Sequence, residues 1–144
     1  MGELDDFRTD TLARQTEAMR ALFSGDQAPF IRMWSIQDPL SLFGAWGACT
    51  TGTDELNRVY RWVGSRFSQC SDLRFDVEVI DIIGDLAYTV GCERFTASVD
   101  GRPAEPMTIR VTHVYRRENG QWKIVHRHGD WAPIDESLAA PPSP

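Results

Sequence analysis

Basic residues and long apolar stretches are scarce in this sequence, and each scarcity excludes a class of protein. The chain has 15 Lys and Arg against 21 Asp and Glu, which leaves a net charge of −6. Nucleic acids and anionic membranes attract basic surfaces, so we expect the protein to bind neither. No apolar run approaches the roughly 20 residues that cross a bilayer. The start, MGELDD, is acidic where a secretory signal is basic and then apolar. We therefore expect a cytoplasmic protein.

Cysteine is also scarce, and its spacing carries no metal or disulfide pattern. The chain has Cys49, Cys70 and Cys92, an odd number at wide intervals without a CxxC pair. Neither a disulfide framework nor a zinc finger is indicated. A free cysteine usually behaves as a small buried hydrophobe. We expect that role here, and no bound cofactor.

The length and composition favour a single globular domain. The chain has 144 residues, of which 42% are apolar and 25% are charged. These values allow one domain with a substantial core. The end of the chain, AAPPSP, is rich in proline, which is typical of a disordered or loosely extended tail. We predict a domain over residues 1–135 and a disordered tail over residues 136–144.

The first half of the chain has a helical pattern. Apolar residues recur at helical spacing from Asp5 to Phe23, and Ser-Gly-Asp ends that segment. Pro29 suits the first turn of a short helix that reaches Trp34. An apolar segment over residues 40–46 predicts a first strand. A third helix begins at Thr53, with an apolar stripe that reaches Phe67.

After Ser71 the apolar period changes from helical to two. The alternation slips at Ile80, which indicates a bulge. A turn at 84–85 leads into a strand predicted over residues 86–98. A longer connection at 100–106 leads to a strand over residues 107–117, and the turn at 119–120 joins this to a last strand over residues 122–131. Helices followed by antiparallel strands favour an α+β fold with the helices on one face of the sheet.

The Asn119-Gly120 pair sets the pairing of the last two strands. A two-residue loop at these positions, with strands of regular alternation, predicts the pairs Tyr115–Ile124, His113–His126 and Val111–His128. Opposed residues share a face of the sheet. We therefore expect all three histidines of the chain to face the helices, and Arg127 to face solvent.

Three interpretations of this histidine cluster stay open. The imidazoles are half-buried core residues with hydrogen-bond partners, or they form the floor of a pocket that supports acid–base chemistry. In the third interpretation they bind a metal, as three-histidine zinc sites do. Glu93 is then a candidate fourth ligand.

The segment THVYRRENGQWKIVHRHGDWAP resembles the closing hairpin of the SnoaL-like/NTF2-like superfamily. It is similar to the branch that includes ketosteroid isomerase-related bacterial proteins of the SnoaL-3 type and the association domain of calcium/calmodulin-dependent kinase II. The segments at 84–95 and 40–47 resemble earlier strands of that branch. The resemblance implies a cone, in which a curved antiparallel sheet wraps around three N-terminal helices. It also implies a pocket at the wide end and a homodimer.

The same resemblance argues against authentic steroid isomerisation. Phe43 and Gly44 stand about where ketosteroid isomerase has its carboxylate base, and no tyrosine precedes Tyr60. The association domain places pocket arginines at positions that match Glu93 and His113. We therefore expect this pocket to lack those cations.

Our first functional hypothesis is a homodimer that binds a small hydrophobic organic ligand and supports isomerisation, cyclisation or dehydration. His113 and His126 would exchange protons while Glu93 orients them. Five further residues are candidates for ligand binding: Trp34, Trp46, Tyr60, Tyr115 and His128. The alternatives are an assembly or ligand-sensing module without turnover, and a histidine-ligated metalloprotein.

Overall fold

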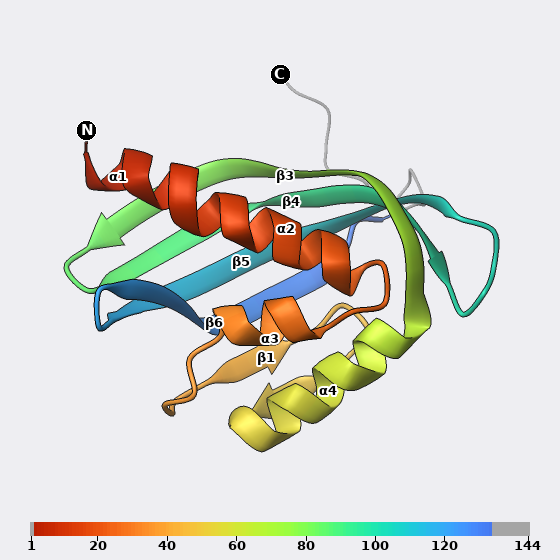
Figure 1. The fold of residues 1–144 in the computed structure, drawn as a ribbon, viewed down its shortest axis with the longest axis horizontal. Helices are drawn as coiled ribbons and strands as arrows, with labels where there is room; N and C mark the ends of the chain where they lie inside the picture. Colours follow the sequence, from red (N-terminus) through yellow and green to blue (C-terminus); the bar gives the residue numbers. More distant parts are fainter. Residues whose placement is uncertain (1, 134–144) are drawn as a thin grey trace.

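The helices occupy the positions that the apolar spacing predicts. In the computed structural model, which describes residues 2–133, α1 (Glu3–Asp6), a π-helical stretch (Phe7–Leu12) and α2 (Ala13–Leu22) continue one another along one side of the sheet (Figure 1). The short α3 (Ala28–Met33) has proline in its first turn, and α4 (Thr53–Arg66) follows the first two strands. The predicted tail at 136–144 lies outside the described residues.

The remaining chain forms one six-stranded sheet with the order β2-β1-β6-β5-β4-β3. Its strands are β1 (Ser41–Phe43), β2 (Cys49–Thr51), β3 (Phe67–Ile83), β4 (Leu86–Val99), β5 (Glu105–Glu118) and β6 (Gln121–Trp131). All neighbours are antiparallel except β1 and β6, which run parallel, so the sheet is mixed. The strand predicted over residues 40–46 is shorter than expected, since β1 covers only Ser41–Phe43. The sequence did not predict β2.

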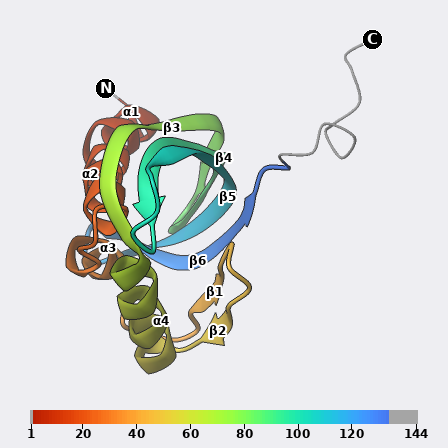
Figure 2. The same cartoon turned by 90° about the vertical axis from the view of Figure 1, so that its right-hand side faces the viewer.

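The sheet is strongly curved, and its long strands curl around the interior (Figure 2). The pairing of β3 with β4 shifts three times, and one shift lies between Val77 and Val79, close to the bulge predicted at Ile80. Gly91 faces this place from β4, where an added Cβ would overlap the backbone oxygen of Asp76. The bulges and the glycine allow β3 to cross tightly over β4. The α+β cone is thus confirmed.

The final hairpin begins as predicted and then departs from the prediction. Asn119 and Gly120 both have positive φ, at 51° and 77°, as a type I′ turn requires. Tyr115 pairs with Ile124 as expected, but β6 then carries one extra residue, Val125. Beyond this bulge the observed pairs are Val114–His126, His113–Arg127 and Thr112–His128.

The bulge reverses the expected faces of β6. The predicted opposition of His113 and His126 is wrong, because His126 now shares the outer face with Val114. His128 likewise lies on the outer face and is exposed. Arg127, expected in solvent, is instead buried beside His113, with 6% of its surface exposed. One inserted residue is enough for this exchange because side chains alternate with a period of two.

Candidate functional site

A buried ion pair lies at the centre of the cone. Arg127 of β6 donates from both terminal nitrogens to the two carboxylate oxygens of Glu93 on β4, at 2.6 and 2.7 Å. Glu93 is fully buried. A buried carboxylate needs a partner. The expected partner was a histidine, but the structure supplies an arginine in the bidentate geometry that suits a carboxylate.

His113 of β5 completes this group as a neutral acceptor. Its Nε2 lies 3.0 Å from Nη1 of Arg127. A guanidinium can only donate, so Nε2 accepts and the ring carries its hydrogen on Nδ1. Burial, and then the positive charge of Arg127, lower the pKa of His113 well below its ordinary value. The ring is therefore uncharged near neutral pH.

Positions 93 and 113 carry no arginine, as the resemblance led us to expect, but the interior holds a cation from another position. Burial opposes the charge on Arg127, but the Glu93 carboxylate more than offsets it and raises the pKa of the guanidinium above its ordinary value. This arginine comes from β6, whereas the resemblance pointed to positions 93 and 113.

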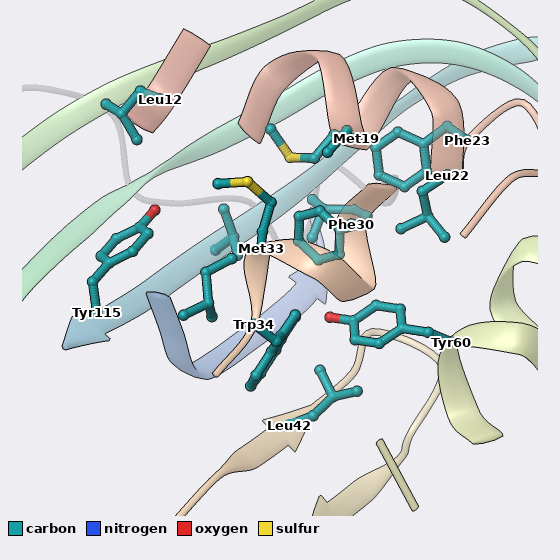
Figure 3. Close-up of a cluster of buried hydrophobic side chains, with 14 of the residues drawn as sticks. Leu12, Met19, Leu22, Phe23, Phe30, Met33, Trp34, Leu42, Tyr60 and Tyr115 are labelled. Carbon is teal, nitrogen blue, oxygen red and sulfur yellow. The ribbon is translucent and has the colours of Figure 1, made fainter. Parts of the chain in front are cut away.

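Two further polar groups of the interior reach no hydrogen-bond partner among the described residues. They are Nε1 of Trp34, at the end of α3, and the hydroxyl of Tyr60 on α4. The two rings are neighbours, with centroids 6.0 Å apart, and the hydroxyl points from α4 into the interior toward Trp34 (Figure 3). Nδ1 of His113 and Nε2 of Gln15 are also buried without a partner among these residues. These groups keep unused hydrogen-bonding capacity.

Tyr115 was expected to contact a ligand, but it is bonded within the core. Its hydroxyl donates to Oε1 of Gln15 on α2 at 2.6 Å and lies 3.4 Å from the Thr89 hydroxyl. Its ring packs edge-on against Phe7, with centroids 5.0 Å apart. The side chain is fully buried. Tyr115 therefore connects the N-terminal helical segment, which runs from α1 to α2, to the sheet.

A small apolar cavity of about 50 Å³ lies between α4, the β1–β2 turn and the sheet. Its wall includes Leu42, Trp46, Tyr60, Trp62, Phe67 and Arg127. Trp46 stacks on Phe67, with centroids 4.9 Å apart, and meets Trp62 edge-on at 5.8 Å. The predicted residues Trp46 and Tyr60 thus meet at one cavity, and Arg127 joins them.

The remaining predicted residues lie elsewhere. Nδ1 of His126 lies 2.7 Å from the Ser41 hydroxyl on the outer face of the sheet, and the ring of His128 lies 5.4 Å from Phe43. Burial, and then His128, lower the pKa of His126. Within residues 2–133, no three metal-ligating side chains come together as a site for an ion. The structure therefore does not assemble the three-histidine cluster.

Sequence reasoning missed Arg127, although two signals pointed to it. An inward-facing Glu93 needs a buried cation, and β6 is close enough to provide one. Gly129 lies inside the same strand, and a glycine within a strand often accompanies a bulge or a close approach. Together these features favour the observed register of β5 and β6, in which His113 pairs with Arg127.

Comparison with known proteins agrees with the fold. A candidate dehydratase of the NTF2-like family from Streptomyces avermitilis superposes with a TM-score of 0.74 and 19% identity, over 92% of this chain and all of that one. A ketosteroid isomerase-like protein from Erwinia carotovora atroseptica superposes with a TM-score of 0.74 and 16% identity, over 92% of this chain and 99% of that one. A candidate calcium/calmodulin-dependent protein kinase type II association domain from Thiobacillus denitrificans superposes with a TM-score of 0.67 and 16% identity, over 85% of this chain and 92% of that one.

The sequence itself decides the family. No curated protein matches the chain, and within the described residues no helix has both the length and the apolar character of a membrane span. The family profile described as SnoaL-like domain, however, matches residues 12–134, which is most of the chain. The order of helices and strands and the curved sheet agree with it. This protein belongs to the SnoaL-like domain family.

Proposed function

We propose that this protein binds a small, largely apolar organic molecule in the cavity between α4, the β1–β2 turn and the sheet. The observation that carries the proposal is the composition of the wall. Aromatic and aliphatic side chains make up most of it, while Arg127 and Tyr60 provide polar groups. Organic ligands usually bind in apolar cavities that offer a few fixed polar groups.

The cavity must widen before a ligand enters. Its volume of about 50 Å³ is smaller than a benzene ring requires, and typical ligand pockets enclose roughly 300–1,000 Å³. Trp46 lies on the short connection between β1 and β2, and Trp62 is 46% exposed. Outward movement of these two rings would open the cavity without disturbing the Arg127–Glu93 pair.

We favour binding over acid–base turnover, although two similar structures carry the names of a candidate dehydratase and a ketosteroid isomerase-like protein. Among the described residues, no histidine or carboxylate lines this cavity. Glu93 is engaged by Arg127 at both oxygens, and the free lone pair of His113 accepts from the same arginine. Isomerisation, cyclisation or dehydration would require one of these groups to be released.

Saturation-transfer NMR with ethylbenzene, acetophenone and indole tests the proposal. We expect at least one of these probes to bind the unaltered protein. Val63→Phe should abolish that binding, because Val63 lines the cavity and the larger ring fills it. Arg61→Phe, on the exposed side of the same helix, should leave binding intact. Absence of binding by all three probes, or equal binding by both variants, would contradict the proposal.

A homodimer is our second proposal, and the outer face of the sheet supports it. One row of paired residues crosses five strands there, and its members are Val79, Val90, Thr112, His128 and Phe43. Val79, Val90 and Phe43 are 44%, 37% and 41% exposed. Exposed apolar side chains on one face mark a candidate interface, and this interface would also serve the alternative role as an assembly module.

A further inference from the structure

The unused hydrogen-bonding groups of the interior are almost all donors. The indole N–H of Trp34 can only donate, and the neutral ring of His113 exposes an N–H at Nδ1. The Tyr60 hydroxyl can donate as well as accept. Each of these atoms is buried and makes no hydrogen bond of normal geometry among the described residues, although the Trp34 N–H and the Tyr60 hydroxyl interact weakly with one another. An isolated buried donor is costly. Of these groups the Tyr60 hydroxyl lines the cavity, so that is where a ligand can supply the missing acceptor.

Arg127 adds to this excess of donors at the cavity itself. A guanidinium has five N–H groups, and three of its hydrogen bonds go to Glu93 and His113. The remaining N–H groups belong to a side chain that lines the cavity. Tyr60 lines the same cavity, and the Phe30 ring lies close to both, with centroids 5.3 Å from Tyr60 and 5.8 Å from the guanidinium carbon.

The charge of the interior distinguishes among possible acceptors. Glu93 already balances Arg127 through two short hydrogen bonds. A carboxylate ligand would therefore bring an uncompensated negative charge into a largely apolar space, which is unfavourable. A ligand ammonium would meet donors and an arginine. A neutral oxygen acceptor satisfies the free donors without adding charge.

On the basis of the proposed function, the geometry points to a specific class of ligand: a neutral molecule with a compact apolar body and a carbonyl oxygen. The body contacts Trp46, Phe67 and Leu42. The oxygen accepts from the Tyr60 hydroxyl and the free N–H groups of Arg127. Tyr60 and Arg127 are thus the residues that determine specificity, and Glu93 is a positioning residue that holds the guanidinium.

Acetophenone, ethylbenzene, benzoate and 1-phenylethylammonium test this inference, because they share one ring and differ in the polar group. We expect acetophenone to bind about tenfold more tightly than ethylbenzene, as one good hydrogen bond provides. Acetophenone should also bind more tightly than the two ions. The carbonyl stretch of bound acetophenone should shift to lower frequency, which reports the hydrogen bond directly.

Tyr60→Phe removes the hydroxyl alone, and the ratio of acetophenone to ethylbenzene affinity should fall toward one. Tyr88→Phe is the matched control, since Tyr88 lies on the outer face of β4, and it should keep the ratio. Equal affinity for acetophenone and ethylbenzene, or a preference for either ion, would overturn the inference while the apolar pocket stands. Failure of all four probes and of indole to bind the unaltered protein would overturn the proposed function as well.

Discussion

Arg127 is the residue on which the interior of this protein depends. Taking a charged pair out of water costs several kcal/mol per ion, and only close geometry with further hydrogen bonds recovers that cost. Arg127 meets these conditions through Glu93 and His113. Removing Arg127, Glu93 or His113 alone should therefore lower the free energy of unfolding.

Arg127→Met should lower the free energy of unfolding by about 3–5 kcal/mol, because it leaves the Glu93 carboxylate buried without a partner. Urea denaturation measures this loss. Arg127→Met combined with Glu93→Leu should lose much less than the sum of the two single changes, because no charge remains buried. Arg110→Met breaks an exposed pair with Asp130 and is the control, with little effect expected. Additive losses in the double variant would contradict this account.

His113 should make the protein less stable in mild acid. Its pKa is lowered in the folded state by burial and by Arg127, so below about pH 6.5 the unfolded chain takes up a proton that the folded chain refuses. The free energy of unfolding should therefore fall as the pH drops from 7.5 to 5, by at most about 1.4 kcal/mol per pH unit for this one group.

The comparison with His113→Gln isolates this contribution. Glutamine offers Arg127 an acceptor but does not titrate, so the fall between pH 6.5 and 5 should become shallower. The lowered pKa of His126 acts in the same direction and remains in both proteins. Parallel stability curves from urea denaturation, with equal slopes in this window, would show that His113 is not the cause.

At the scale of the elements, the irregularities of the strands position the site. The extra residue in β6 turns Arg127 inward, and the shifts in β3 bend that strand over β4. Bulges increase twist and redirect side chains. A regular sheet of the same sequence would place Arg127 in solvent and would leave Glu93 without its cation.

Gly91→Ala should test how tightly β3 crosses β4. The added Cβ would overlap the Asp76 backbone oxygen and would lie 3.0 Å from the Cα of Val77. Because backbone cannot yield as a side chain can, we expect a loss of about 1–3 kcal/mol in the free energy of unfolding, measured by thermal or urea denaturation. Gly44→Ala is the matched control, since its Cβ would meet only the Ala48 Cβ at 3.7 Å. Equal stability of the two variants would contradict the close crossing.

At the scale of the whole molecule, the two faces of the sheet have different roles. The inner face, with α2 and α3, encloses the hydrophobic core (Figure 3) and also the Arg127–Glu93 ion pair. The outer face presents the row from Val79 to Phe43, where β3, β4, β5, β6 and β1 lie side by side. A ligand cavity and a homodimer interface would therefore not compete for the same surface.

Val90→Lys should convert the proposed dimer to a monomer, because it places a charge within the row. Sedimentation velocity measures the change. Ile83→Lys is the control: Ile83 is 66% exposed at the far end of β3, outside the row. We expect it to remain a dimer. A monomeric unaltered chain at high protein concentration would refute this interface.

Local signals in the sequence determined most of the architecture. The helical stripe before Phe23, the change to a period of two after Ser71 and the Asn119-Gly120 turn each depend on neighbours in the chain, and each is confirmed. The cavity residues Trp46 and Tyr60 were also found from the sequence and its resemblance. Such patterns report which face of an element is apolar, and the backbone then follows.

The tertiary structure decided which face the end of β6 presents. Up to Ile124 the predicted and observed pairs agree, and one extra residue then exchanges Arg127 with the two histidines. The alternation of side chains does not by itself select between these registers, since both place alternate residues on each face. Glu93, 34 residues away in the chain, needs a buried cation, and the parallel pairing of β1 with β6 places Ser41 beside His126. The site therefore depends on charge balance between distant strands, which exists only once the chain has folded.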